Sequence, residues 1–162
     1  MKDRLPSLLS EEIQKACAVG IPVETRCLSI RMNNRLRAVF GRCIRRENGF
    51  AIEISGRMAE APENALRQTI AHELLHTCPG CFDHGPLFRQ YADRLNRKYG
   101  YAIKRANRAD EMGVPERTRT AQYLLICTSC SRQFPRERKS AVVSHPQRYR
   151  CPHCGGTLRR VK

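Results

Sequence analysis

The sequence has no long apolar run. No stretch of the 162 residues approaches the ~20 consecutive apolar residues that a membrane-spanning helix needs. No N-terminal apolar segment precedes a cleavage site, so we expect no secretory leader. The nine cysteines are an odd number, and their clear pairings have the spacing of metal ligands. These features predict a cytoplasmic protein in a reducing compartment, without membrane contact, which would be nucleoid-associated if it binds DNA. We also expect a monomer.

Acidic residues are scarce. The chain has 15 Asp and Glu against 30 Lys and Arg, which gives a net charge of +15 and a pI near 10.0. Residues 100–162 hold 14 basic and 4 acidic side chains, so the excess is concentrated in the C-terminal part. Solubility rarely requires this much charge of one sign. The charge therefore favours a polyanionic partner, for which nucleic acid is the expected class.

A His-Glu-Leu-Leu-His run at residues 72–76 carries the clearest chemistry. Positions four apart share one helix face, so His72 and His76 can bind one ion while Glu73 leans toward its remaining coordination position. His84 follows after a short loop and could supply a third ligand. Three protein ligands and one open position are typical of catalytic zinc, whose bound water would give its proton to Glu73. The run predicts a hydrolytic zinc site with Glu73 as general base.

A second group of metal ligands lies near the C-terminus. Two Cys-x-x-Cys pairs, separated by twenty residues, match a four-thiolate zinc ribbon. Short strands are expected over 123–126 and 147–150, and Gly155 and Gly156 permit a tight turn. We interpret His145 and His153 as surface residues, because four thiolates already fill a tetrahedron. The ligands of this structural zinc would be Cys127, Cys130, Cys151 and Cys154, so the chain is expected to hold two zinc ions.

The order of elements predicts an α+β fold. A helix over 6–19 precedes three strands over 26–32, 39–45 and 50–54, followed by helices over 62–77 and 86–99. We expect a small antiparallel sheet with the HExxH-bearing helix, a zincin-like minimal protease core, whose last strand presents an edge to an extended substrate. The expected domains are a protease domain over 1–103, a linker over 104–121 and the zinc ribbon over 122–162.

These motifs together resemble the SprT-like, Spartan-related zinc metallopeptidases. The resemblance rests on residues 72–76, on His84-Gly-Pro-Leu-Phe88, and on the ribbon with its Arg148-Tyr-Arg-Cys-Pro-His-Cys-Gly-Gly run. It implies that His72, His76 and His84 bind the catalytic zinc, that Glu73 is catalytic, and that the substrates are DNA-associated proteins, as in DNA–protein crosslink repair. The loop over 77–83 departs from the family by its shortness and by a Cys-Pro-Gly-Cys turn.

Basic residues of the ribbon are the expected nucleic-acid contacts: Arg132, Arg136, Arg138, Lys139, Arg148 and Arg150, with Arg159 and Arg160 nearby. Phe134 or Tyr149 could stack on exposed bases, which favours single-stranded or unpaired DNA. A second cluster contains Arg31, Arg35, Arg37, Arg42, Arg45 and Arg46, and could instead be the polar face of a sheet.

Several points remain open at the level of sequence. Cys78 and Cys81 could form a metal clip or a redox-sensitive lock, although an inert turn is the favoured interpretation. The other single cysteines, Cys17, Cys27 and Cys43, are expected to be buried. Candidates for the group that stabilises the oxyanion are Tyr91, Tyr99, Tyr101 or an arginine.

Two other functions compete with the peptidase. A YbeY-like zinc-dependent RNase also uses three histidines and an Asp-His element such as Asp83-His84, but it lacks the HExxH glutamate. The second alternative is a non-catalytic zinc-ribbon factor that binds nucleic acid, and the presence of Glu73 argues against it.

Overall fold

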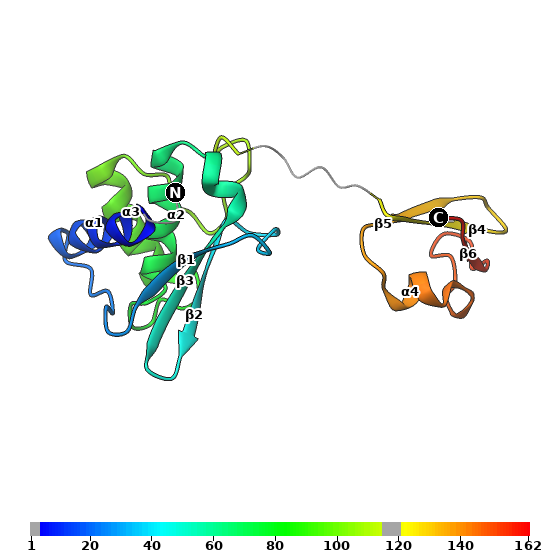
Figure 1. Ribbon diagram of the computed structural model, residues 1–162, viewed down its shortest axis with the longest axis horizontal. Coiled ribbons are helices and arrows are strands. Elements are labelled where there is room, and N and C mark those ends of the chain that lie inside the picture. The colour runs from blue at the N-terminus through cyan, green and yellow to red at the C-terminus, as the bar shows by residue number, and fades with distance from the viewer. Residues whose placement is uncertain (1–3, 115–120) are drawn as a thin grey trace. The chain divides into compact units, whose positions relative to one another are not determined.

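The structure is a computed structural model that describes residues 4–114 and 121–162, and the chain divides into two compact units, 1–116 and 117–162 (Figure 1). The first unit contains α1 (Leu5–Ala18), β1 (Ser29–Asn33), β2 (Gly41–Arg46), β3 (Gly49–Ser55), the 3-10 helix η2 (Gly56–Glu60), α2 (Glu63–Leu75) and α3 (Pro86–Tyr99). The second contains β4 (Tyr123–Cys127), β5 (Gln133–Arg136), α4 (Ala141–Ser144), η3 (Pro146–Arg148) and β6 (Leu158–Arg160). None of the helices in the described ranges is long and apolar enough to cross a membrane.

The expected α+β class is confirmed, and the sheet of the first unit is mixed. β3 lies in the centre, parallel to β1 and antiparallel to β2. After β1 the chain therefore crosses to the far edge to form β2, and then turns back to form β3 between β1 and β2. The expectation that the last strand forms an edge is wrong, because β3 is central and the edges are β1 and β2. β1 begins only at Ser29, since Cys27 has a left-handed backbone (φ 49) that interrupts the extended run.

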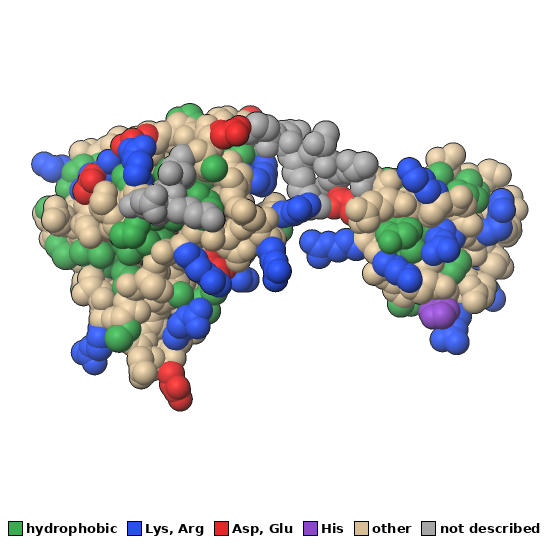
Figure 2. All heavy atoms as spheres, viewed as in Figure 1, with side chains coloured by type: hydrophobic (Ala, Val, Ile, Leu, Met, Phe, Trp, Pro, Cys, Tyr) green, Lys and Arg blue, Asp and Glu red, His purple; other side chains and the backbone are tan. Residues whose placement is uncertain are grey.

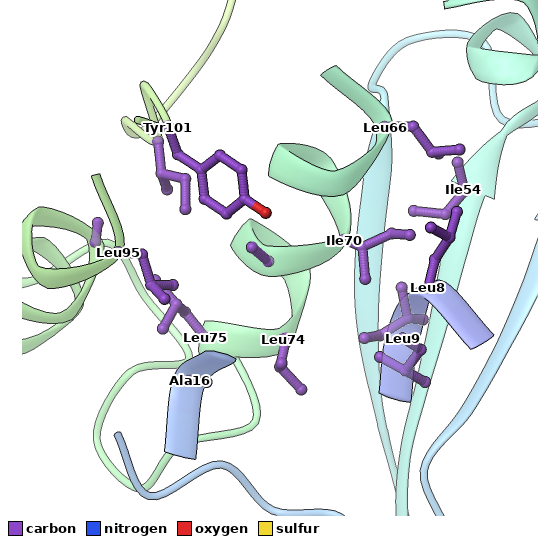
Figure 3. Packing of buried hydrophobic residues seen from close by; sticks show 14 of the residues in the cluster. Leu8, Leu9, Ala16, Ile54, Leu66, Ile70, Leu74, Leu75, Leu95 and Tyr101 are labelled. Atoms are coloured by element: carbon purple, nitrogen blue, oxygen red, sulfur yellow. The ribbon is translucent and has the colours of Figure 1, made fainter. Parts of the chain in front are cut away.

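Helix α2 is buried on both sides. Its predicted apolar stripe of Leu66, Ile70 and Leu74 is confirmed, with exposed fractions of 2% or less. Figure 3 shows Leu66 and Ile70 beside Ile54 and the α1 side chains, while Leu75 points toward Leu95 of α3. Because α1 and the sheet cover one side and α3 the other, the axis of α2 is fixed.

The segment after α3 belongs to the first unit rather than to a linker. Ile103, Met112 and Val114 are 5%, 3% and 4% exposed and join the main hydrophobic core. The Gln68 side chain also accepts a hydrogen bond from the backbone N–H of Ala102 at 2.8 Å. The expected linker over 104–121 is therefore wrong for its first part. Its residues 115–120 lie outside the described residues.

The second unit is built on the sheet β5-β4-β6, in which β4 is central and both pairings are antiparallel. Pro135 lies on the terminal strand β5, where its missing N–H removes no hydrogen bond from the sheet interior. The expected strand over 147–150 is wrong: Pro146 opens the 3-10 helix η3, and only Arg150 forms an isolated bridge, to Thr157.

A buried carboxylate lies on the face of the first sheet that points away from α2. Glu53 pairs across the sheet with Arg31 on β1 and Arg42 on β2, so all three side chains share this face. Arg31 and Arg42 bind opposite oxygens of the carboxylate, at 2.9 and 2.8 Å from their Nε atoms, and Asn33 donates to it at 2.7 Å. Burial raises the pKa of Glu53, but these donors outweigh burial and lower it to about 2.

Stability of the first unit should therefore depend on pH through Glu53. Its folded pKa lies below the unfolded value of about 4.3, so its contribution is fully present above that pH and is lost as pH falls toward 2. Glu53→Gln should lower the free energy of unfolding at pH 7 by about 2–3 kcal/mol and should flatten the acid dependence. Urea unfolding of the two proteins at pH 7, 4 and 3 measures both effects.

Glu47→Gln is the matched control, because Glu47 is exposed in the turn between β2 and β3. It should leave the stability and its pH dependence unchanged. Equal effects of the two substitutions would contradict a special role for the Glu53 carboxylate.

Candidate metal centres

Three histidines converge at the C-terminal end of α2. His72 lies in the last turn of α2, His76 caps it, and His84 comes from the loop before α3. One ring nitrogen from each lies within 4.8 Å of the others, and the Nε2 atoms of His72 and His84 are 3.0 Å apart. Two ligands of a tetrahedral zinc at 2.0–2.1 Å would be about 3.3–3.4 Å apart. The predicted trio therefore fits a single zinc ion.

Contacts with neighbouring residues hold the three histidine rings in position. His76 donates from Nδ1 to the carbonyl of Cys81 at 2.8 Å, which leaves Nε2 free for a metal. The backbone of Lys104 lies near the His72 ring and acts to raise its pKa, against the larger effect of burial. Phe88 of α3 packs against all three rings, with centroid separations of 4.8–5.0 Å. Such second contacts fix the ring orientation that metal binding requires.

The histidines are neutral near pH 7. Burial, followed by repulsion from His76 and His84, lowers the pKa of His72 to about 3. Burial is also the largest cause that lowers the pKa of His76 and of His84. Neutral imidazole is the form that binds metal, so burial keeps these histidines in the protonation state that a metal site needs.

Glu73 lies where the backbone of β2 meets α2. It is 7% exposed, and burial raises its pKa to about 8, an effect that the N–H of Cys43 partly offsets. A dication at the histidines would favour its charged form again. Gly41 permits this close approach, because a Cβ atom there would lie 2.7 Å from Cγ and 2.8 Å from Oε1 of Glu73.

A cleft of about 420 Å³ opens in front of these residues. Its walls are residues 38–43 of β2 and the preceding loop, and residues 103–107 after α3. Val39 and Phe82 at the cleft are 46% and 52% exposed, although both are apolar. These two residues, with Phe88, are site residues that the sequence analysis missed. Of these three residues, only Phe82 and Phe88 had a signal in the sequence, namely their positions on either side of His84.

None of the three candidate tyrosines lines the cleft. Tyr101 donates to Glu12 at 2.8 Å, Tyr99 to the Lys15 carbonyl at 3.3 Å, and Tyr91 packs under Arg94. Arginines do line the cleft, namely Arg42 and Arg105. The Arg42 guanidinium binds Glu53 on the opposite face of the sheet, so Arg105 is the candidate for charge stabilisation in the cleft.

The cysteines outside the ribbon take different positions. Cys78 and Cys81 are 3% and 0% exposed, and burial raises the pKa of both thiols, to about 12 for Cys78. This favours the inert interpretation over a reactive pair. The expectation that the single cysteines are buried is wrong: Cys17 and Cys27 are exposed and Cys43 is half-buried at the cleft.

The four ribbon cysteines form a second metal-binding group. The Sγ atoms of Cys127 and Cys154 are 3.4 Å apart and those of Cys130 and Cys151 are 3.7 Å apart, near the ~3.8 Å expected for thiolates bound at 2.3 Å to tetrahedral zinc. Backbone N–H groups of Cys130 and Ser129 lower the pKa of Cys127. The donor set therefore fits zinc.

Both cysteine turns close in the same way. The residue after each pair, Ser131 or Gly155, has a left-handed backbone with φ of 58 and 73. Its N–H donates to the carbonyl of the first cysteine, at 3.0 Å for Cys127 and 2.8 Å for Cys151. Gly155 adopts this conformation without strain, as the sequence indicates.

The predicted nucleic-acid contacts are all exposed on the second unit: Arg132, Arg136, Arg138, Lys139, Arg148 and Arg150. Of the two candidate stacking residues, Tyr149 is 40% exposed. Phe134 instead packs beside the cysteine cluster. Tyr149 is thus the aromatic side chain available to a base.

Comparison with known proteins agrees with the geometry of the first unit. The SprT-like family model matches residues 7–109. The chain belongs to the SprT-like family. The family is of the metallopeptidase type. The matched residues include all three histidines and Glu73, and they end before the four-cysteine group. A search among curated proteins finds no match.

Two zinc ions should bind to each chain of this protein at independent sites. His84→Ala should leave one zinc and an intact second unit, because only the histidine site loses a ligand. Cys130→Ser should also leave one zinc but should unfold the second unit, where metal binding supplies folding free energy. Elemental analysis together with circular dichroism measures both.

Cys17→Ser is the control, since Cys17 is exposed and belongs to neither group. It should retain two zinc ions. A single zinc in carefully prepared wild-type protein would rule out the two-site arrangement.

Proposed function

We propose that this SprT-like protein is a zinc-dependent endopeptidase that cuts DNA-associated proteins, with its basic ribbon binding the DNA. The observation that carries the proposal is the convergence of His72, His76 and His84 with Glu73 on one cleft. Peptidase chemistry needs these groups together, whereas a structural metal site would be closed by a fourth protein ligand.

The residues divide the chemistry between them. Zinc, when bound by the three histidines, supplies a water of lowered pKa and a Lewis acid for the scissile carbonyl. Glu73 accepts the proton of the attacking water and delivers it to the leaving amine. The Cys43 N–H aims the carboxylate of Glu73, and the absent side chain of Gly41 gives it room.

The free edge of β2 offers a way to hold the substrate. β2 pairs with β3 on one side only, and residues 38–43 line the cleft. An extended peptide added to this edge would lie alongside Glu73 and bond mainly through its backbone. Binding of this type requires no particular sequence, which suits an enzyme that cuts many proteins.

The ribbon supplies the DNA contact in this proposal. Residues 121–162 hold nine basic side chains and a single acidic one, Glu137. Each phosphate contact would release a counterion, so DNA affinity should fall steeply with salt. DNA that holds enzyme and substrate together would raise their effective concentration.

A cleavage assay with a DNA-bound protein substrate tests both halves. Wild-type protein loaded with zinc should cut the substrate faster with DNA than without it, and this stimulation should disappear as salt rises. Glu73→Gln should retain zinc and cut at least about 10²-fold more slowly, because an amide cannot accept the proton. Glu60→Gln, which changes an exposed glutamate outside the cleft, should behave as wild type.

The outcomes separate the alternatives. Cleavage by Glu73→Gln at the wild-type rate would remove the general-base mechanism. DNA binding without any proteolysis would favour the non-catalytic ribbon factor, and metal-dependent loss of an added RNA would favour the RNase. Proteolysis at the same rate with and without DNA would favour a general peptidase.

Gly41→Ala should lower kcat by about 10²-fold, since the new methyl group would push the Glu73 carboxylate out of position. Zinc content and the unfolding temperature should be retained, because the φ of Gly41 suits any residue. The same methyl group would also approach Thr69, at 3.0 Å from its Cγ2.

The double variant Gly41→Ala/Thr69→Ser separates these two contacts. Serine removes the crowded methyl group and keeps a hydroxyl able to donate to the Ala65 carbonyl, as Thr69 does. Recovery of activity in the double variant would show that the loss in Gly41→Ala comes from the contact with Thr69 and not from the contact with Glu73.

A further inference from the structure

The positive charge of the first unit is confined to one part of the sequence. Residues 26–49, which include β1, β2 and the loop between them, hold seven basic side chains and one acidic side chain. The remaining residues of 1–116 hold 12 basic and 13 acidic side chains. The whole excess of the unit therefore lies on these two strands and the loops that adjoin them.

All seven basic side chains are arginines, which we call the sheet arginines: Arg26, Arg31, Arg35, Arg37, Arg42, Arg45 and Arg46. Every one is exposed. Figure 2 shows Lys and Arg side chains lying over the strands of this sheet. A guanidinium binds phosphate through two parallel hydrogen bonds, a geometry that lysine cannot supply.

Two of the sheet arginines are held in place. The buried carboxylate of Glu53 binds Arg31 and Arg42 from beneath, yet their side chains remain 68% and 50% exposed. One negative charge thus fixes two positive groups on neighbouring sides of β3. These two side chains are already ordered in the free protein, so they lose less conformational entropy when an anion binds to this face.

Other sheet arginines lack an internal counterion. Within the described residues, the side chains of Arg35, Arg37 and Arg46 form no hydrogen bond or ion pair. By contrast, Arg67 on α2 contacts three glutamates. Isolated surface charges of one sign repel each other, and a polyanion would remove this cost.

We propose that the sheet arginines other than Arg45 form a second nucleic-acid-binding surface, which contacts the phosphate backbone independently of the ribbon. Arg45 is left out because its guanidinium lies over the Phe50 and Phe82 rings on the other face of the sheet. The inference rests on the proposed DNA binding and adds a site on the first unit. Phosphate contacts made by arginines without base-reading partners give binding without sequence preference. A nucleic acid is favoured over a membrane because, among the described residues, the exposed large apolar side chains near this surface are Val39 and Phe82, and both line the cleft.

The test compares two full-length variants that lose the same charge. Arg35→Ala/Arg37→Ala/Arg46→Ala removes three sheet arginines and leaves Arg31, Arg42 and Glu53 intact. The control Arg89→Ala/Arg97→Ala/Lys98→Ala removes three exposed cations from α3, which packs on α2 and not on the sheet. Affinity for a short DNA duplex is measured by fluorescence anisotropy over a series of salt concentrations.

The sheet variant should bind more weakly, and the slope of log K against log salt should become shallower by about 2–3, at roughly 0.9 per lost contact. The α3 control should keep the wild-type slope. Both variants should retain two zinc ions, the wild-type unfolding temperature and cleavage of a DNA-free substrate.

Equal slopes for the two variants, with wild-type protein still binding DNA, would overturn the second surface and leave the ribbon as the contact. Failure of the wild-type protein to bind DNA at low salt would instead overturn the proposed function. Loss of anionic-vesicle binding by the sheet variant, with an unchanged DNA slope, would identify a membrane surface and reject the nucleic-acid proposal.

Discussion

Helix α2 is packed between two apolar surfaces, and the geometry of the histidine site depends on that packing. Ile70 and Leu74 are fully buried, so the helix can neither rotate nor slide without exposing them or opening a cavity. His72 and Glu73 therefore face the cleft from a fixed axis. Phe88 of α3 then completes the site by packing against the three imidazole rings. Hydrophobic packing thus positions the polar chemistry.

Strand β2 serves both faces of the first unit. Its inner face and free edge bring Gly41 and the Cys43 N–H to Glu73, while its outer face carries Arg42 against the buried Glu53. A change that shifts β2 would therefore alter the carboxylate in the cleft and the arginine face together. The Glu53 ion pairs stabilise the strand from one side, and the contact with α2 does so from the other.

The sequence predicted which residues come together in the two candidate metal-binding groups better than it predicted the topology. The metal ligands were predictable because helical spacing and Cys-x-x-Cys spacing are local rules, and the stripe of α2 follows the same periodicity. The parallel pairing of β1 with β3 was not predictable, since strand order depends on packing against helices that are distant in sequence. The polar composition of the segment containing Met112 and Val114 predicts a linker, because it conceals two core residues. Phe88 was recognised as a helix residue, but its contact with the histidines depends on how α3 folds back onto α2.

The two basic surfaces have different physical support. On the first unit a buried carboxylate orders Arg31 and Arg42 from beneath. On the second unit the buried cluster is small, and two of its three buried residues, Cys127 and Cys151, belong to the metal-binding group. Each phosphate contact by itself is weak. If both surfaces bind nucleic acid as proposed, the chain would bind one strand more tightly than either surface alone, because the second contact becomes intramolecular. Specificity in such an enzyme would then come from which proteins occupy the DNA rather than from the DNA sequence.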